Sequence, residues 1–122
     1  FESYLRSDAM QVYRYAWFAD MPDPDDFLRP LFASDSTANF MRYRNGEVDQ
    51  MLLKAASTVD MEERVAGYRM IEQEIASSCP MIPLMYFGID VVHRPNVQDY
   101  YLTALGAHTT RYHGVWLKKP LP

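Results

Sequence analysis

The 122-residue sequence predicts a single domain of the α/β or α+β class, spanning residues 1–122. Two segments carry apolar residues at the three- and four-residue spacing of an amphipathic helix. They alternate with short runs rich in aromatic and β-branched residues, which favour strands. Hydrophobic residues make up 48% of the chain, enough for one core at this length. Such alternation is typical of a domain in which helices pack on a sheet.

The N-terminal part predicts the end of a helix, a strand and a short second helix. Phe1, Tyr4 and Leu5 have helical spacing, and the chain opens inside this helix without an initiator Met, which predicts a fragment of a longer protein. The aromatic run Gln11–Ala19 predicts a strand packed on at least one face. After the turn, Asp23 can cap a helix that begins with Pro24 and runs to about Phe32.

The middle of the chain predicts two helices. The first follows Asn45 and Gly46 and carries one apolar face, formed by Val48, Met51, Leu52, Ala55 and Ala56. The second begins with a capping box, Asp60 with Glu63 three residues later. Its apolar face comprises Met61, Val65, Tyr68, Ile71 and Ile75, and it should end at the SSCP sequence, with Cys79 as a small buried side chain.

The C-terminal part predicts strands. Pro80 and Pro83 bracket the apolar run MIPLMYFGI at residues 81–89, which is too short and too rich in proline for a helix. A further strand should cover Asp90 to His93, and another should cover Arg111 to Leu117 after a turn at Gly106.

Composition excludes several classes of protein. The formal net charge of −4 gives no general attraction to a polyanion, so nucleic acid is not an expected partner. A single cysteine, Cys79, rules out an intrachain disulfide, a zinc finger and a dithiol redox motif. No apolar run approaches the roughly 20 residues of a membrane-spanning helix.

The densest polar feature is a run of four aspartates, Asp20, Asp23, Asp25 and Asp26. Helix capping accounts for the last three, because carboxylates favour the first turn of a helix. Two functional alternatives compete with capping: an oxygen-rich calcium site and a carboxylate pair for acid–base hydrolysis. The spacing lacks the glycine and the final glutamate of a twelve-residue calcium loop.

Capping does not explain Asp20. This residue follows the predicted strand beside Trp17, where a carboxylate in an aromatic-walled cleft could pair with a ligand ammonium group. Arg14, on the same predicted strand, could bind a carboxylate through two parallel hydrogen bonds. Together these residues suit a zwitterionic ligand; the alternative is that Arg14 and Asp20 pair with each other or face solvent.

Metal and enzyme motifs are absent from the sequence. His93, His108 and His113 match no compact metal-ligand spacing. The chain has no G-x-S-x-G, no phosphate-binding glycine loop and no H-E-x-x-H. We therefore expect no catalytic residues, no bound metal and no cofactor.

Several short motifs together resemble the C-terminal part of family 5 extracytoplasmic solute-binding proteins. These proteins are the oligopeptide, dipeptide and nickel binding components of ABC importers. In chain order the motifs are W-x-A-D, D-P-D-x-F-L, N-x-x-x-Y-x-N, D-x-x-x-R and C-P-x-I-P-L. The resemblance covers almost the whole chain.

The resemblance implies a fold, a site and a function. The fold would be the C-terminal lobe of a two-lobed α/β protein of the type II periplasmic-binding kind. Asp20 would receive the α-ammonium group of a peptide, Trp17 would line the peptide site and Arg14 would meet the peptide carboxylate. The protein would not be an enzyme: it would capture short peptides outside the cytoplasmic membrane, in the periplasm or as an anchored lipoprotein, and deliver them to the membrane permease of an ABC importer.

One position departs from the family pattern, and other functions remain open. The family usually has glycine where this chain has Asp99, so a turn that needs positive φ would be less favourable here. Nickel or another small solute is the nearest alternative ligand within the family. A carboxylate-dependent hydrolase and a stand-alone interaction module are the alternatives from other classes.

Overall fold

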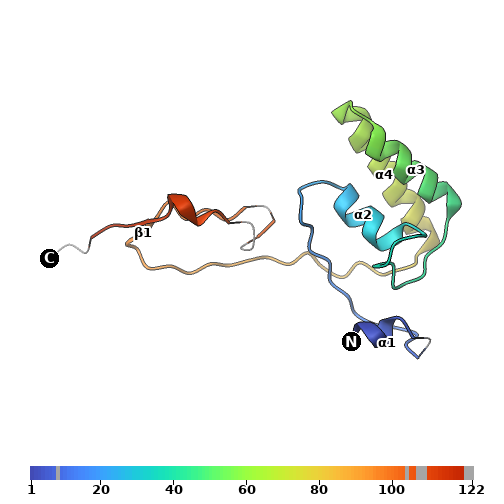
Figure 1. The fold of residues 1–122 in the computed structure, drawn as a ribbon, viewed down its shortest axis with the longest axis horizontal. Coiled ribbons are helices and arrows are strands. Elements are labelled where there is room, and N and C mark those ends of the chain that lie inside the picture. The colour runs from blue at the N-terminus through green and yellow to red at the C-terminus, as the bar shows by residue number, and fades with distance from the viewer. Residues whose placement is uncertain (8, 104, 107–109, 120–122) are drawn as a thin grey trace. The chain divides into compact units, whose positions relative to one another are not determined.

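The computed structural model describes residues 1–7, 9–103, 105–106 and 110–119, which form two compact units. The first unit comprises Phe1–Ala19 and Asp23–Pro83. The second unit comprises Asp20–Pro22 and Leu84–Pro122. Most of the regular structure lies in the first unit, as Figure 1 shows.

The first unit contains the helices α1 (Glu2–Leu5), α2 (Asp25–Phe32), α3 (Gly46–Ser57) and α4 (Met61–Ser78). α3 packs along α4, and α2 packs against α3 (Figure 1). These helices confirm the sequence-based predictions: α2 ends at Phe32, α3 follows Asn45, and α4 ends at the SSCP sequence. None of the described helices is both long and apolar enough to cross a membrane.

Polar side chains bond the first turns of these helices where the sequence predicts caps, although α2 begins at Asp25 and its N-cap residue is Pro24, one residue after Asp23. The Asp23 carboxylate accepts the Asp25 N–H at 2.8 Å, and the Asn45 side chain accepts the N–H groups of Glu47 and Val48. The Asp60 carboxylate accepts the Glu63 N–H at 2.9 Å. Each acceptor satisfies a backbone donor that the first helical turn leaves unbonded.

α4 ends at Cys79, which adopts the left-handed conformation with φ of 48°. Its N–H donates to the carbonyls of Ile75 and Ala76, and Pro80 follows, which cannot continue a helix. The prediction that Cys79 is buried is wrong: the residue is exposed. Cys79 lies past the last helical residue of α4, so the helical spacing that buries Tyr68, Ile71 and Ile75 does not extend to it.

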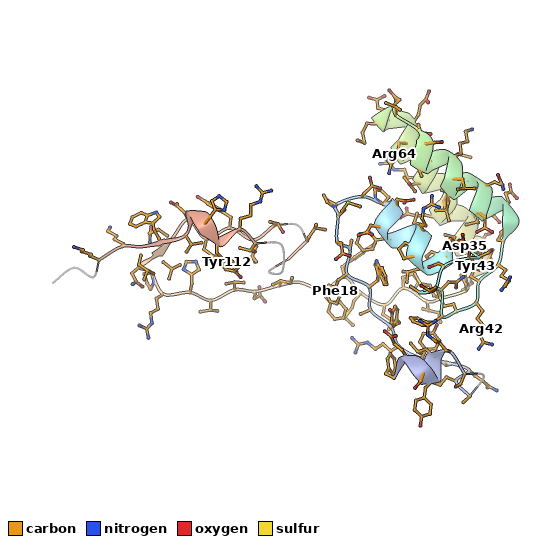
Figure 2. All side chains as sticks on the ribbon, in the orientation of Figure 1. Phe18, Asp35, Arg42, Tyr43, Arg64 and Tyr112 are labelled. Atoms are coloured by element: carbon orange, nitrogen blue, oxygen red, sulfur yellow. The ribbon has the colours of Figure 1, made fainter. Side chains whose placement is uncertain are left out.

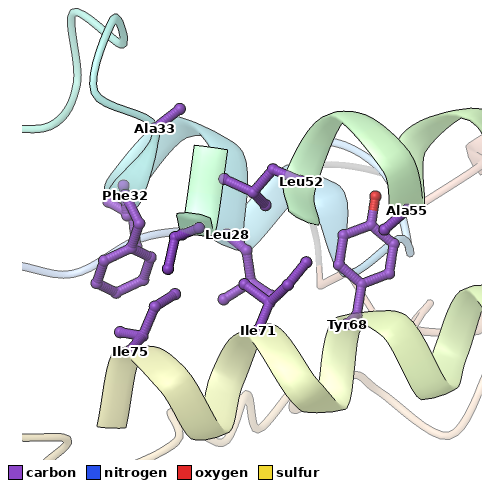
Figure 3. Packing of buried hydrophobic residues seen from close by; sticks show 10 residues of the cluster. Leu28, Phe32, Ala33, Leu52, Ala55, Tyr68, Ile71 and Ile75 are labelled. Carbon is purple, nitrogen blue, oxygen red and sulfur yellow. The ribbon is translucent and has the colours of Figure 1, made fainter. Parts of the chain in front are cut away.

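The core of the first unit lies between α2, α3 and α4. Figure 3 shows Tyr68, Ile71 and Ile75 of α4 facing Leu52 and other apolar side chains of α2 and α3. The buried members of the cluster are Leu28, Leu31, Phe32, Ala33, Val48, Leu52, Ala55, Tyr68, Ile71 and Ile75. The predicted faces of α3 and α4 therefore form the core, apart from Ala56 and Met61, which are exposed, and Val65, which is half-buried outside the core cluster.

A buried asparagine holds the connection between α2 and α3. Asn39 is only 9% exposed; its amide donates to the carbonyls of Ala33 and Tyr43 and accepts the Tyr43 N–H. These bonds satisfy the backbone groups of a loop that passes beside the core, as burial requires.

The second unit contains the strands β1 (Val97–Gln98) and β2 (Trp116–Leu117), which pair antiparallel, and the 3-10 helix η2 (Tyr112–Gly114). Val97 lies opposite Leu117 and Gln98 opposite Trp116. Asp99 follows β1 with φ of 57°, the left-handed conformation expected at the position where the family has glycine. Its carboxylate accepts the indole N–H of Trp116 at 2.6 Å, which joins the two strands.

Most of the predicted strands are wrong. Residues 13–19 and 82–93 have no helix or strand assignment. The strand predicted for Arg111 to Leu117 is present only at Trp116–Leu117, and η2 occupies Tyr112–Gly114. The physical reason is that a strand needs a neighbour to accept and donate its backbone hydrogen bonds. A strongly strand-forming sequence cannot provide that neighbour by itself.

Candidate functional site

Trp17 is the predicted site residue with the best-defined surroundings. Its indole N–H donates to the Asp26 carbonyl in the first turn of α2, at 2.6 Å. The side chain is half-buried and packs against the core cluster, and the Tyr15 ring lies 6.5 Å away between ring centroids. The hydrogen bond fixes one edge of the indole, so the orientation of this ring is coupled to α2.

Arg14 and Asp20 are both exposed. Arg14 and Trp17 belong to the first unit, and Asp20 belongs to the second. The segment expected to be a strand carrying Arg14 and Trp17 has no strand assignment. That these three residues converge on one ligand therefore stays a prediction.

The aspartate run is largely explained by helix contacts. Asp23 caps α2, and both of its carboxylate oxygens contact Arg64 of α4, at 2.8 and 2.9 Å from Nη2. In Asp25, one oxygen accepts the Tyr68 hydroxyl at 2.8 Å and the other accepts Arg29 Nε at 3.0 Å. These two carboxylates bind side chains of the fold, so the geometry does not support their use as an acid–base pair.

Arg64 and Tyr68 also contact the aspartate run, and the sequence does not predict these contacts. They lie four residues apart on one face of α4, and the Arg64 guanidinium carbon lies 5.2 Å from the centre of the Tyr68 ring. Nη1 of Arg64 also donates to the Ala55 and Ala56 carbonyls in the last turn of α3, at 3.2 and 3.1 Å. Arg64 was visible in the sequence only as the last residue of the D-x-x-x-R motif that begins at Asp60.

Together these side chains form a network that we call the α2 clamp: Asp23, Asp25, Arg29, Arg64 and Tyr68. Arg29 extends it by donating to the Leu52 carbonyl of α3 at 3.0 Å. Figure 2 shows Arg64 among the helices of the first unit. The clamp joins the start of α2 to side chains of α4, and its two arginines also bond backbone carbonyls of α3.

The charges of the clamp shift the pKa of its members. Partial burial opposes ionisation of Asp23, but the Asp25 N–H and the Arg64 guanidinium outweigh it and lower the pKa of Asp23 below its usual value. Burial, together with the hydrogen bond to Asp25, raises the pKa of Tyr68 well above 10. The clamp is therefore built from an ionised Asp23 and a neutral Tyr68 at neutral pH.

The described residues contain no group of three or more side chains arranged to hold a metal ion. His93 and His113 are exposed, and His108 lies outside the described residues. Two shallow hollows occur elsewhere: about 270 Å³ on α4 beside Val65, and about 470 Å³ in the second unit beside Arg111. Neither hollow is lined by Arg14, Trp17 or Asp20.

Comparison with known proteins relates this chain to transport proteins. It is 35% identical over 71 residues to the peptide transport periplasmic protein SapA of Salmonella typhimurium, covering 56% of this chain and 13% of that protein. It is 32% identical over 92 residues to the di/tripeptide-binding protein 4 of Pseudomonas aeruginosa, covering 73% of this chain and 17% of that protein. It is 30% identical over 94 residues to the heme-binding protein A of Haemophilus influenzae, covering 75% of this chain and 17% of that protein.

The matched region thus spans less than a fifth of the length of each of these relatives. No protein-family model matches the chain. All three relatives are named for transport or binding of a small ligand, and none is named for catalysis.

Proposed function

Because the chain belongs to the family 5 extracytoplasmic solute-binding proteins, we propose that the whole protein captures short peptides and delivers them to the permease of an ABC importer. The observation that carries this proposal is the similarity to SapA and to the di/tripeptide-binding protein 4, both named for peptides. A glutathione-binding protein of Shigella dysenteriae, 27% identical over 101 residues, adds a relative named for a peptide-like ligand. Capture takes place in the periplasm or at a lipid-anchored protein outside the membrane.

In this proposal the chain contributes part of the C-terminal lobe of a two-lobed α/β protein that closes over its ligand. Closure buries the ligand and creates the conformation that a permease distinguishes from the empty protein. The α2, α3 and α4 bundle provides a rigid support for the segment that precedes it, because its core is continuous across all three helices.

The ligand contacts follow from the parts that all peptides share. A carrier that accepts many side chains gains affinity from the termini and the backbone of the peptide. Asp20 pairs with the α-ammonium group, Arg14 meets the carboxylate and Trp17 lines the peptide site. The exposure of Arg14 and Asp20 and the half-buried ring of Trp17 support these roles, since a binding residue has to be reachable by its ligand.

The proposal is tested by calorimetry on the full-length protein with a tripeptide and with the same tripeptide acetylated at its N-terminus. Acetylation removes the ammonium charge, so the wild-type protein should bind the acetylated peptide at least about tenfold more weakly. Asp20→Asn should weaken binding of the free peptide by a similar factor and should abolish the difference between the two peptides. Such a loss of difference identifies Asp20 as the partner of the ammonium group.

Asp35→Asn is the matched control, because Asp35 is an exposed aspartate of the first unit. It should bind both peptides as the wild type does. Equal affinity of wild type and Asp20→Asn for the free peptide would remove Asp20 from the site. Titration with nickel or heme in place of the peptide tests the other ligands, and a wild-type protein that binds one of these but no peptide would overturn the proposed function.

A further inference from the structure

Trp17, one residue of the proposed site, and the α2 clamp meet at the first turn of α2. Trp17 donates to the Asp26 carbonyl, and the neighbouring Asp23 and Asp25 are the two carboxylates of the clamp, bound by Arg64 and Tyr68. In sequence, Asp20 lies between Trp17 and Asp23. The segment from Trp17 to Asp23, which carries the proposed ligand contacts Trp17 and Asp20, therefore ends at a carboxylate that Arg64 binds.

We infer that Arg64 and Tyr68 of α4 are positioning residues for the proposed peptide site. They hold Asp23 and Asp25, and through them the first turn of α2, to which Trp17 is hydrogen-bonded; two residues of chain link Asp20 to Asp23. The inference rests on the proposed function. It assigns to Arg64 and Tyr68 an effect on peptide affinity that does not require either residue to contact the peptide.

The geometry of Arg64 supports a positioning role over a general contribution to packing. One of its nitrogens contacts both oxygens of Asp23, and the other contacts two carbonyls of α3. Opposite ends of a planar, rigid group thus set the distance between α2 and the end of α3. A shorter or more flexible cation cannot make both sets of bonds at once.

Tyr68 fixes the second carboxylate. Its ring is buried in the core, only 2% exposed, and its hydroxyl reaches Asp25 at 2.8 Å. Since a buried ring has little freedom to rotate, the hydroxyl is a fixed point for the first turn of α2. Loss of the hydroxyl removes this point while leaving the ring in the core.

The consequence for binding is specific to the amino end of the peptide. An ammonium–carboxylate pair depends steeply on geometry, and a displacement of about 1 Å in a binding group is enough to lose much of its effect. Displacing the turn should therefore weaken recognition of the ammonium group more than it weakens contacts elsewhere along the peptide.

The experiment compares Arg64→Gln with Arg69→Gln in the full-length protein. Both changes remove one positive charge from α4, but Arg69 is exposed on that helix and has no part in the clamp. Arg64→Gln should bind a free tripeptide about tenfold more weakly than Arg69→Gln, and the ratio of affinities for free and acetylated peptide should fall toward one. A change that affected only stability would lower the melting temperature and leave this ratio as in the wild type.

Tyr68→Phe provides a second variant that retains the buried ring, so the test holds even where Arg64→Gln fails to fold. It should lower the same ratio by a smaller factor. Unchanged ratios in either folded variant would overturn the inference while leaving the proposed function intact. A wild-type protein without preference for the free peptide would instead contradict the ammonium site itself.

Discussion

At the residue scale, most motif positions of this chain have a structural task that can be read from its contacts. In N-x-x-x-Y-x-N, Asn39 bonds the backbone of Tyr43 and Asn45 caps α3. Asp60 caps α4 and Arg64 binds Asp23. A sequence pattern that identifies the family thus contains more residues that build the helical bundle than residues that can touch a ligand.

The caps could be predicted from the sequence because each acts within three residues of its own position. The Asp23–Arg64 pair could not, because 41 residues separate its partners and several acids and bases compete for each of them. The role of Asp20 is harder still to predict from the sequence, because it depends on a ligand as well as on the fold. The local contacts of the aspartate run are therefore predictable from the sequence, whereas its tertiary contacts are not.

The Asp23–Arg64 pair predicts a pH dependence of stability. A carboxylate whose pKa is lowered by folding stabilises the protein fully above its unfolded pKa of about 3.9, and this contribution is lost as the pH falls through the folded value. Asp23→Asn retains a capping side chain but loses the charge. Its melting temperature should lie a few degrees below that of the wild type at about pH 7, and the gap should close as the pH falls below about 4.

Calorimetric melting curves of the full-length protein over this range of pH measure the gap directly. Asp35→Asn serves again as the control and should show no gap at any pH. A difference between wild type and Asp23→Asn that persisted unchanged in acid would show that the ionised pair is not its source.

At the element scale, the helices of this chain were predictable and the strands were not. The apolar spacing of α3 and α4 selects one face each, and these two faces meet in the core. Residues 82–93 are rich in apolar and β-branched residues that favour strands, yet they have no strand assignment. A helix satisfies its own backbone, whereas a strand has to find its bonding partner elsewhere in the protein.

Adjacent leucines of α3 test this account of the bundle. Leu52 is fully buried, with 0% of its surface exposed, whereas Leu53 is 56% exposed. Leu52→Ala should lower the free energy of unfolding by about 2–5 kcal/mol, because it removes buried methyl groups and leaves a cavity. Leu53→Ala, one residue along the same helix, should change it by less than about 0.5 kcal/mol. Urea unfolding followed by helical circular dichroism compares the two, and similar losses in both would contradict the assigned faces.

At the scale of the whole molecule, the segment 82–93 combines strand-forming residues with a backbone that has no helix or strand assignment. Its large apolar side chains are exposed, with Leu84 at 68% and Val92 at 97%. Apolar residues on an extended backbone favour addition to a sheet, where neighbouring strands satisfy the backbone and cover the side chains. The relatives are much longer proteins, since the matched region covers only 13–17% of their length, so such a sheet can come from chain beyond these residues.

Hydrogen exchange can show whether the rest of the protein supplies that sheet. Amides of residues 82–93 should exchange quickly in a 122-residue fragment, because no strand of the described residues bonds them, and should become at least about a hundredfold slower in the full-length protein. Amides of α4 from Tyr68 to Ile75 provide the internal control, since helical bonds should protect them in both. If residues 82–93 exchange as fast in the full-length protein as in the fragment, the strand prediction for this segment is wrong for the whole protein too, and its apolar side chains need another explanation.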